Sequence, residues 1–323
     1  MLRAYLQRHP YVRKWMIAAD FSLHNKKRPL DCFAFTFVPY DAWLGEIEQD
    51  ATALPKDLKK SKSLDDEAIE WLREPRRFHL AITVNKNPAV FSNAPGSPAL
   101  TIAREHIDKT LAAIARQDVD ADTVKRFKQL KQDAQANSFN VSLLADIWLL
   151  AVWFASLTVL LARERKCTII GWFPDRDNMT NYCNHIWANY GLWNAQSFAE
   201  AFQVDMRGTQ CPIGVPDRSG AKKRMWFDYM IRAADWLAGA VSAWDRTNNL
   251  IPGEHDKYRQ MLEDVITDAD NIVILHFDIT ETGMQFRRIL PTRKNWLMRI
   301  VTWIRNTAVR FWHWATYKLG WTV

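Results

Sequence analysis

Short apolar runs bounded by turn residues alternate with longer amphipathic segments along this chain. Such short runs are typical of strands, and they predict strands at residues 14–20, 30–40, 78–85, 167–172, 271–277 and 284–290. The polar stretch "HNKKRP" between the first two runs predicts a hairpin. The run "CTIIGW", apolar along most of its length, is typical of a strand in a parallel pairing.

The longer segments have apolar residues at helical spacing, and they predict helices at residues 99–117, 123–136, 142–162, 224–245 and 257–267. Residues 51–77 are dense in charge, and we expect a solvated excursion with one short helix there. After the fourth predicted strand, "FPDRDNMT" marks a turn into a helix, which Asp177 or Asn178 can cap.

The order of these elements is three strands, a group of helices, a fourth strand and further helices. It matches the topology of ribonuclease H, in which an antiparallel three-stranded meander and a crossover helix precede a fourth strand parallel to the first. Parallel neighbours end at the same sheet edge, where sites in open α/β sheets form. We therefore expect an α/β, RNase H-like domain over residues 1–290, with a mixed sheet flanked by helices.

One carboxylate interrupts an apolar helical stripe in "MIRAADWLAGAVSAWD", residues 230–245. Removing an ionised Asp235 from water costs several kcal/mol unless a partner compensates it. An ion pair with Arg232 or Arg224 is one solution, and a bound cation is another. We also expect Ala234 and Gly239 to let this helix approach the sheet closely.

Two further acids stand where strands end. Asp20 ends the first predicted strand and Asp175 follows the fourth, so the predicted topology places them side by side, with Asp235 closing the cluster. Both also fit ordinary turn positions. Clustered carboxylates attract hard divalent cations such as Mg²⁺ or Mn²⁺, and two such ions can activate water and stabilise a leaving oxygen in phosphodiester cleavage.

Several short motifs add a family resemblance. The segment "GVPDRSGAKKRMWFDYMIRAADWLAGAV" resembles the C-terminal signature of the domain-of-unknown-function 3800 family, with Asp217 and Ser219 matching its Asp-Ser pair. "DFSL" keeps the Asp and Ser of that family's N-terminal Asp-Glu-Ser-Gly, and "IIGWFPDRDNMT" is similar to its strand ending in Asp-Arg. The resemblance spans roughly residues 14–278.

The resemblance implies an RNase H-like fold and a metal-dependent nuclease. The implied catalytic residues and ligands of Mg²⁺ or Mn²⁺ are Asp20, Asp175 and Asp235. The candidate auxiliary residues are Asp177, Asp217, Ser22 and Glu105, the last taken from the predicted crossover helix. The Glu and Gly of the family motif are replaced in "DFSL", which favours a catalytically silent module as the alternative.

The formal net charge of +7 is concentrated near the C-terminus. We interpret residues 291–323 as a basic, amphipathic, Trp-rich helix with six Lys or Arg and no acid. Such a helix can stack on nucleic acid, lie on an anionic membrane, or dock on this chain or on a protein partner. We expect nucleic acid to be guided by five cations, Arg176, Lys222, Lys223, Arg293 and Lys294.

The four cysteines form no C-x-x-C pair, which is typical of a reduced, cytoplasmic protein. Cys183 and His185 lack the second pair that a zinc site needs. The N-terminal "MLRAYLQRHPYVRK" has no long apolar region and no cleavage site, so we expect no signal peptide. Residues 147–162 are apolar enough to belong to a membrane span or a buried helix, and we favour burial.

The leading hypothesis is a cytoplasmic, divalent-metal-dependent nuclease acting on DNA or RNA, in a phage-defence or mobile-element setting. The second is an inactive RNase H-like module that binds a protein partner, or a second copy, through the Trp-rich tail. The third is a membrane-acting effector that uses residues 143–162 and the tail.

Overall fold

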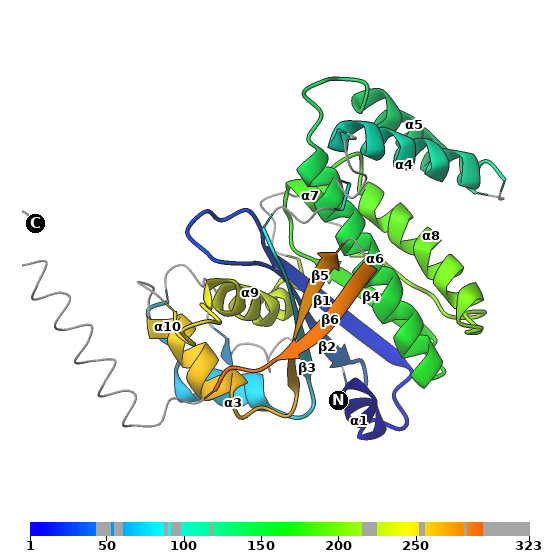
Figure 1. Cartoon of the computed structure of the whole chain (residues 1–323). Coiled ribbons are helices and arrows are strands. Elements are labelled where there is room, and N and C mark those ends of the chain that lie inside the picture. Colours follow the sequence, from blue (N-terminus) through cyan, green and yellow to red (C-terminus); the bar gives the residue numbers. More distant parts are fainter. Residues whose placement is uncertain are drawn as a thin grey trace, which may run out of the picture.

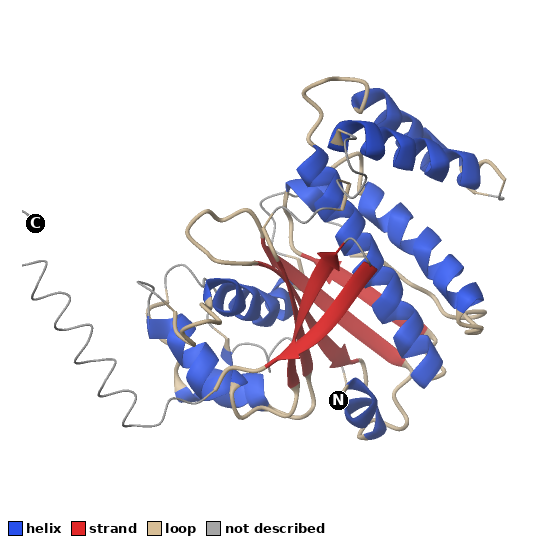
Figure 2. Ribbon diagram, viewed as in Figure 1, coloured by secondary structure: helices blue, strands red, loops and turns tan. Residues whose placement is uncertain are grey.

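The structure, a computed structural model, describes residues 1–42, 53–54, 61–86, 90–91, 98–116, 119–214, 225–251, 256–280 and 283–292. A six-stranded sheet with the order β4-β1-β2-β3-β5-β6 lies at its centre (Figures 1 and 2). The strands are β1 (Lys14–Ser22), β2 (Asp31–Pro39), β3 (Phe78–Val84), β4 (Ile169–Pro174), β5 (Ile272–Thr280) and β6 (Gly283–Ile289).

The first four strands pair as the sequence predicts. β1, β2 and β3 form an antiparallel meander, and β4 lies parallel to β1. The two later strands extend the opposite edge, because β5 runs parallel to β3 and β6 antiparallel to β5. The expected α/β class, with a mixed sheet flanked by helices, is confirmed.

Helices cover both faces of the sheet (Figures 1 and 2). One face carries α1 (Leu2–Gln7), α4 (Ala99–Ile114), α5 (Ala121–Asp133), α6 (Val141–Glu164), α7 (Asn178–Asn181) and α8 (Ile186–Ala201). The other carries α3 (Asp66–Arg73), α9 (Asp228–Ala243), α10 (Asp256–Gln260) and the π-helical turn η3 (Met261–Ile266). Side chains of a strand alternate between the faces, so Trp15 and Ile17 pack under α6 while Met16 and Ala18 pack under α9.

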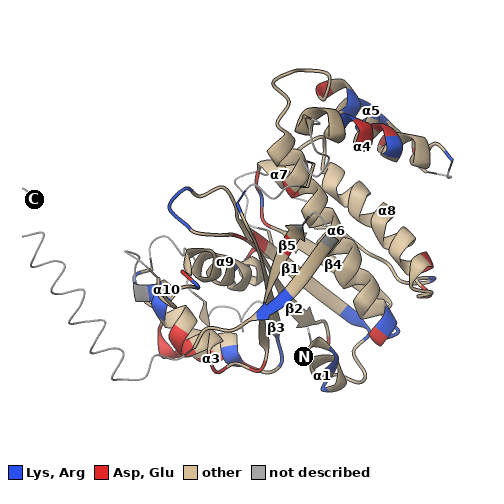
Figure 3. Ribbon diagram, in the orientation of Figure 1, with Lys and Arg blue, Asp and Glu red and all other residues tan. Residues whose placement is uncertain are grey.

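The long apolar helix α6 packs between the sheet and α8. It is the one helix among the described residues that is long and apolar enough to cross a membrane, with a mean hydropathy of 2.1, and 72% of that window is buried inside the fold. A Cβ atom on Gly191 of α8 would lie 2.7 Å from the Phe154 ring of α6. Figure 3 shows both helices without charged residues along most of their length.

Gly239 of α9 has a different role from the one predicted. A Cβ atom there would lie 2.7 Å from the ring of Tyr258 in α10, so this glycine makes room for α10 and not for the sheet. The Tyr258 hydroxyl accepts a hydrogen bond from Arg28 (2.9 Å), and Arg28 also donates to Ser22 (2.7 Å) and Ser242 (2.8 Å). These contacts join the β1–β2 turn to α9 and α10.

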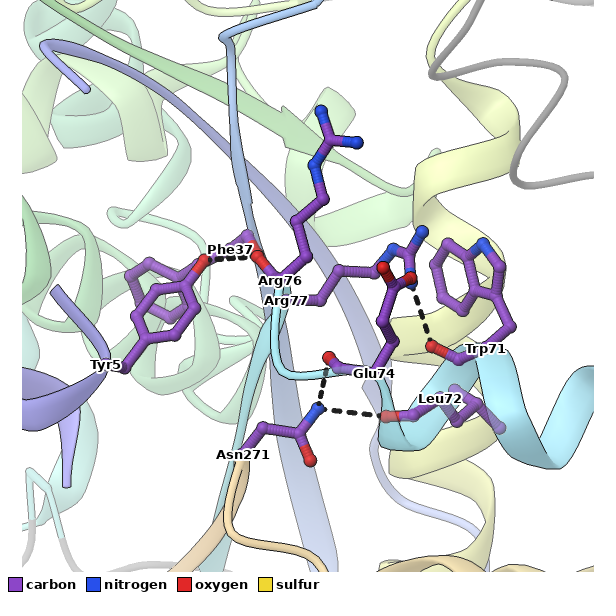
Figure 4. A network of polar contacts seen from close by, with 8 residues as sticks. All are labelled: Tyr5, Phe37, Trp71, Leu72, Glu74, Arg76, Arg77 and Asn271. Atoms are coloured by element: carbon purple, nitrogen blue, oxygen red, sulfur yellow. Dashed lines mark hydrogen bonds and ion pairs between the residues drawn. The ribbon is translucent and has the colours of Figure 1, made fainter. Parts of the chain in front are cut away.

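A second polar network lies at the edge where the parallel strands β3 and β5 begin (Figure 4). Asn271, just before β5, donates to the carbonyl oxygens of Leu72 and Glu74 at 3.1 and 3.0 Å. The Arg77 guanidinium lies 3.7 Å from the ring centre of Trp71, and Figure 4 shows Arg76 turned away from that ring. α3 is thereby fixed to the start of both strands.

Candidate functional site: a carboxylate cluster at the sheet edge

The parallel pairing of β1 and β4 brings Asp20 and Asp175 together. Ala19 pairs with Pro174, the last residue of β4, and the Asp175 amide donates to the Ala19 carbonyl oxygen at 2.8 Å. Asp20 follows Ala19 along β1. Residues two apart in a strand point to the same face, so the Asp20 side chain lies with those of Met16 and Ala18 on the face covered by α9.

The Asp20 carboxyl is 7% exposed and is hydrogen-bonded to the side chain of Asp235, from α9. Burial raises its pKa well above the usual value, and the charges of Asp235 and then Asp175 raise it further. One Asp20 oxygen also accepts a hydrogen bond from the Phe21 amide at 2.6 Å. The structure therefore brings the three predicted acids together, with Asp20 in contact with Asp235.

The donor chemistry of this cluster suits a hard divalent cation, because all three side chains offer carboxylate oxygens. Their positions are those of a hydrogen-bonded carboxyl pair with a third acid nearby. Among the residues that the structure describes, no group of three His, Cys, Asp or Glu side chains has the arrangement of a metal site. Mg²⁺ or Mn²⁺ remains a prediction here.

Asp177 and Arg176 hold the end of β4 in place. The Asp177 carboxylate accepts from the Thr180 amide at 2.8 Å and caps α7, as the sequence predicts. Arg176, a predicted nucleic-acid contact, forms an ion pair with Asp228 at 2.9 Å and so ties the end of β4 to the first turn of α9.

The other predicted residues make other contacts. Ser22 accepts from Arg28 in the network beside α10. Glu105 lies on the exposed side of α4, 4.0 Å from Lys109. Arg232, the sequence alternative for pairing Asp235, precedes it by about one turn on α9, and one of its contacts is a hydrogen bond to the carbonyl oxygen of Leu54 at 3.0 Å. Five predicted residues, and the Trp-rich tail, fall outside the described residues: Asp217, Lys222, Lys223, Arg293 and Lys294.

Three side chains at this same edge were not among the predicted site residues. His24, in the β1–β2 turn, contacts the buried Asp146 of α6 through Nε2 at 2.6 Å. Its amide donates to Asp31 at 2.8 Å, and its Nδ1 lies 3.9 Å from the second oxygen of Asp31. Asp146 is only 5% exposed, whereas the His24 side chain is 44% exposed.

Burial and pairing shift the pKa values of this trio. Burial raises the pKa of Asp146 to about 6 although His24 opposes the shift, and burial also raises the pKa of Asp31. Partial burial lowers the pKa of His24, but the hydrogen bond and charge of Asp146 outweigh it and raise the net value. The signal in the sequence is Asp146 itself, a lone acid in the apolar run that forms α6.

The fold and this edge define an α/β protein with clustered carboxylates where the parallel strands β1 and β4 end. Comparison with protein-family models, curated proteins and solved structures finds no match to this chain. The fold class therefore rests on the observed topology, and the family resemblance stays a prediction.

Proposed function

We propose that this protein is an RNase H-like, divalent-metal-dependent nuclease that cleaves phosphodiester bonds in DNA or RNA. The observation that carries the proposal is the contact between the buried Asp20 and Asp235, with Asp175 at the end of the adjoining strand. The meander with β4 parallel to β1 is the topology expected of such an enzyme.

Three carboxylates so placed repel one another, and the pKa of Asp20 is raised first by burial and then by that repulsion. Without a cation, a proton between Asp20 and Asp235 relieves it. A divalent cation would do so more fully, because it neutralises two charges and takes carboxylate oxygens as ligands.

In this proposal Asp20, Asp175 and Asp235 would hold the metal, which would supply an activated water and stabilise the leaving oxygen. The chain's other residues position them. Arg176 and Asp228 fix α9 against the end of β4, and the capped α7 holds the turn that carries Asp175.

Cleavage of single-stranded DNA, duplex DNA and RNA with Mn²⁺ or Mg²⁺ tests the proposal. We expect Asp235→Asn to lower the cleavage rate at least about 100-fold and to weaken Mn²⁺ binding measured by calorimetry, because the amide removes a charged ligand. Glu105→Gln is the matched control, since Glu105 is an exposed acid on α4, and we expect it to leave both unchanged.

Thermal unfolding of each variant shows whether the fold is kept. Undiminished cleavage by Asp235→Asn would remove the assignment of the site. Mn²⁺ binding that depends on Asp235, without cleavage of any nucleic acid offered, would instead support the silent RNase H-like module.

A further inference from the structure

A cavity of about 890 Å³ lies at the end of the sheet where β1 begins and β2 ends. The residues that line it include Arg8, Tyr11, Arg13, Lys14, Tyr40 and Asp41. Its two walls are joined by the backbone, because the Tyr40 amide donates to the Lys14 carbonyl oxygen at 2.9 Å. The Arg13 carbonyl oxygen accepts from the Thr168 amide at 2.7 Å, which fixes the adjoining residue to the segment before β4.

The cavity carries a positive charge. Arg8, Arg13 and Lys14 are exposed, and none of them has an ion-pair partner among the described residues. Asp41, the one acid among the described residues of the lining, forms an ion pair with Arg76 at 2.7 Å. Three cations around a hollow attract an anion, and the attraction falls with added salt.

Two tyrosines border the same hollow. Tyr11 is 93% exposed and Tyr40 is 36% exposed, so both present ring surface to solvent. Lys14 Nζ lies 5.8 Å from the centre of the Tyr40 ring, which places a cation beside an aromatic face. Aromatic rings interleaved with Lys and Arg are the arrangement that stacks bases and holds phosphates in single-stranded nucleic acid.

We propose that this cavity binds single-stranded nucleic acid, with Tyr11 and Tyr40 stacking on bases and Arg8, Arg13 and Lys14 contacting phosphates. A flexible strand can place a base in a hollow, whereas a bilayer presents a flat surface. An acidic peptide would satisfy the cations but offers no base for the tyrosines. Arg8 also borders a second cavity, whose lining includes Arg73, Asp268 and Asp270.

The cavity is separate from the carboxylate cluster. Lys14 and Asp20 are six residues apart on β1, which at the rise of a strand corresponds to about 20 Å. The proposal deepens the nuclease function by naming a single-stranded substrate contact, and it rests on that function only for its biological role. Binding itself is measurable without cleavage.

Fluorescence anisotropy of a labelled oligothymidylate of about 12 nucleotides, with EDTA present, tests the proposal on the full chain. We expect Tyr11→Ala to weaken binding about tenfold, because the lost ring stacks on a base. We expect Arg13→Ala to weaken binding and to reduce the slope of log K against log salt by about 0.7, as for one phosphate contact to a single strand.

Phe202→Ala and Lys109→Ala are matched controls. Phe202, just after α8, is an exposed aromatic residue, and Lys109, on α4, is an exposed cation, and both are far from the cavity in sequence. Equal affinity of Tyr11→Ala, Arg13→Ala and the unchanged chain for oligothymidylate would overturn the proposal. So would tighter binding, dependent on Arg13, to polyglutamate or to phosphatidylserine vesicles. Neither outcome bears on the nuclease function, whose test is metal-dependent cleavage in Asp235→Asn.

Discussion

His24 and Asp146 show how one residue pair can tie a turn to a helix. His24 adopts a φ of 55°, a left-handed conformation that is uncommon outside glycine, and its imidazole reaches the buried carboxylate of α6. The groups that face the pair are Asp31 from β2, Lys86 beyond β3 and Asp177 before α7. An uncompensated Asp146 would be costly at this depth, so His24 is its stabilising partner.

The pH dependence of this pair has a definite sign. The folded pKa of His24 is raised, so its contribution to stability is complete below its unfolded pKa of about 6.5 and is lost as pH rises through the folded value. The folded pKa of Asp146 is also raised, to about 6, so its contribution likewise falls as pH rises from about 4 to that value.

We expect His24→Gln to lower the free energy of unfolding by about 1 kcal/mol near pH 6.5, because an amide replaces a charged partner of a buried acid. We also expect the variant to lose less stability than the unchanged chain between pH 6.5 and 8.5. Urea denaturation at both pH values measures this, and Lys27→Gln, at an exposed neighbouring cation, is the control. An identical pH profile in His24→Gln would exclude the charged pair.

At the scale of elements, α9 is the helix on which the candidate site depends. It carries Asp235 toward Asp20, and one turn further along the same face of the helix Gly239 lies against the ring of Tyr258. Tyr258 is buried and held by Arg28, so its ring has little freedom to move aside. α9 is therefore held between the sheet and α10.

The substitution Gly239→Ala tests that contact. Alanine is favoured over glycine in a helix by about 1 kcal/mol, but here its Cβ would collide with Tyr258, and overpacking costs typically 1–3 kcal/mol. We expect a net loss of stability of up to about 2 kcal/mol in the otherwise unchanged chain. In a Tyr258→Ala background we expect the same substitution to be stabilising.

Thermal or urea unfolding of the four proteins of this double-mutant cycle gives the coupling between the two positions. A stabilising Gly239→Ala in both backgrounds would mean that α10 does not approach α9 as described.

The whole molecule is a three-layer structure in which α6 is a core helix. Most of its apolar surface contacts the sheet and α8, and Phe154 lies against both Trp172 of β4 and Trp187 of α8. Asn140 caps its first turn by accepting from the Leu143 amide at 3.0 Å. Other parts of the protein therefore bury most of the surface of this helix, which is apolar on all sides.

We expect native-state hydrogen exchange, measured without detergent, to protect the backbone amides of α6 as strongly as those of β1. The reason is that both lie in one core and open together with global unfolding. As an internal control, the last turn of α4 is only partly buried, with Ala112 exposed and Leu111 and Ala113 half-buried, so we expect its amides to exchange sooner. Protection of α6 that appears only in detergent or lipid would indicate a membrane-associated helix.

The sequence alone determined the strands, the principal helices and the meander with β4 parallel to β1. Apolar runs of strand length and amphipathic periodicity are local patterns, so they can be recognised in the sequence without knowledge of tertiary contacts. It also placed Asp20 and Asp175 together, because two adjacent parallel strands end at one edge, and α9 then added Asp235 to them.

Only the tertiary structure decided which side chains far apart in the sequence contact one another. Gly239 faces Tyr258 and not the sheet, Arg176 pairs with Asp228, and Glu105 lies on an exposed face. The pairing of His24 with Asp146 joins residues 122 positions apart, and no local pattern specifies it. Hydrophobic periodicity encodes which face of an element is buried, but which side chain it meets there is set by the packing of the layers.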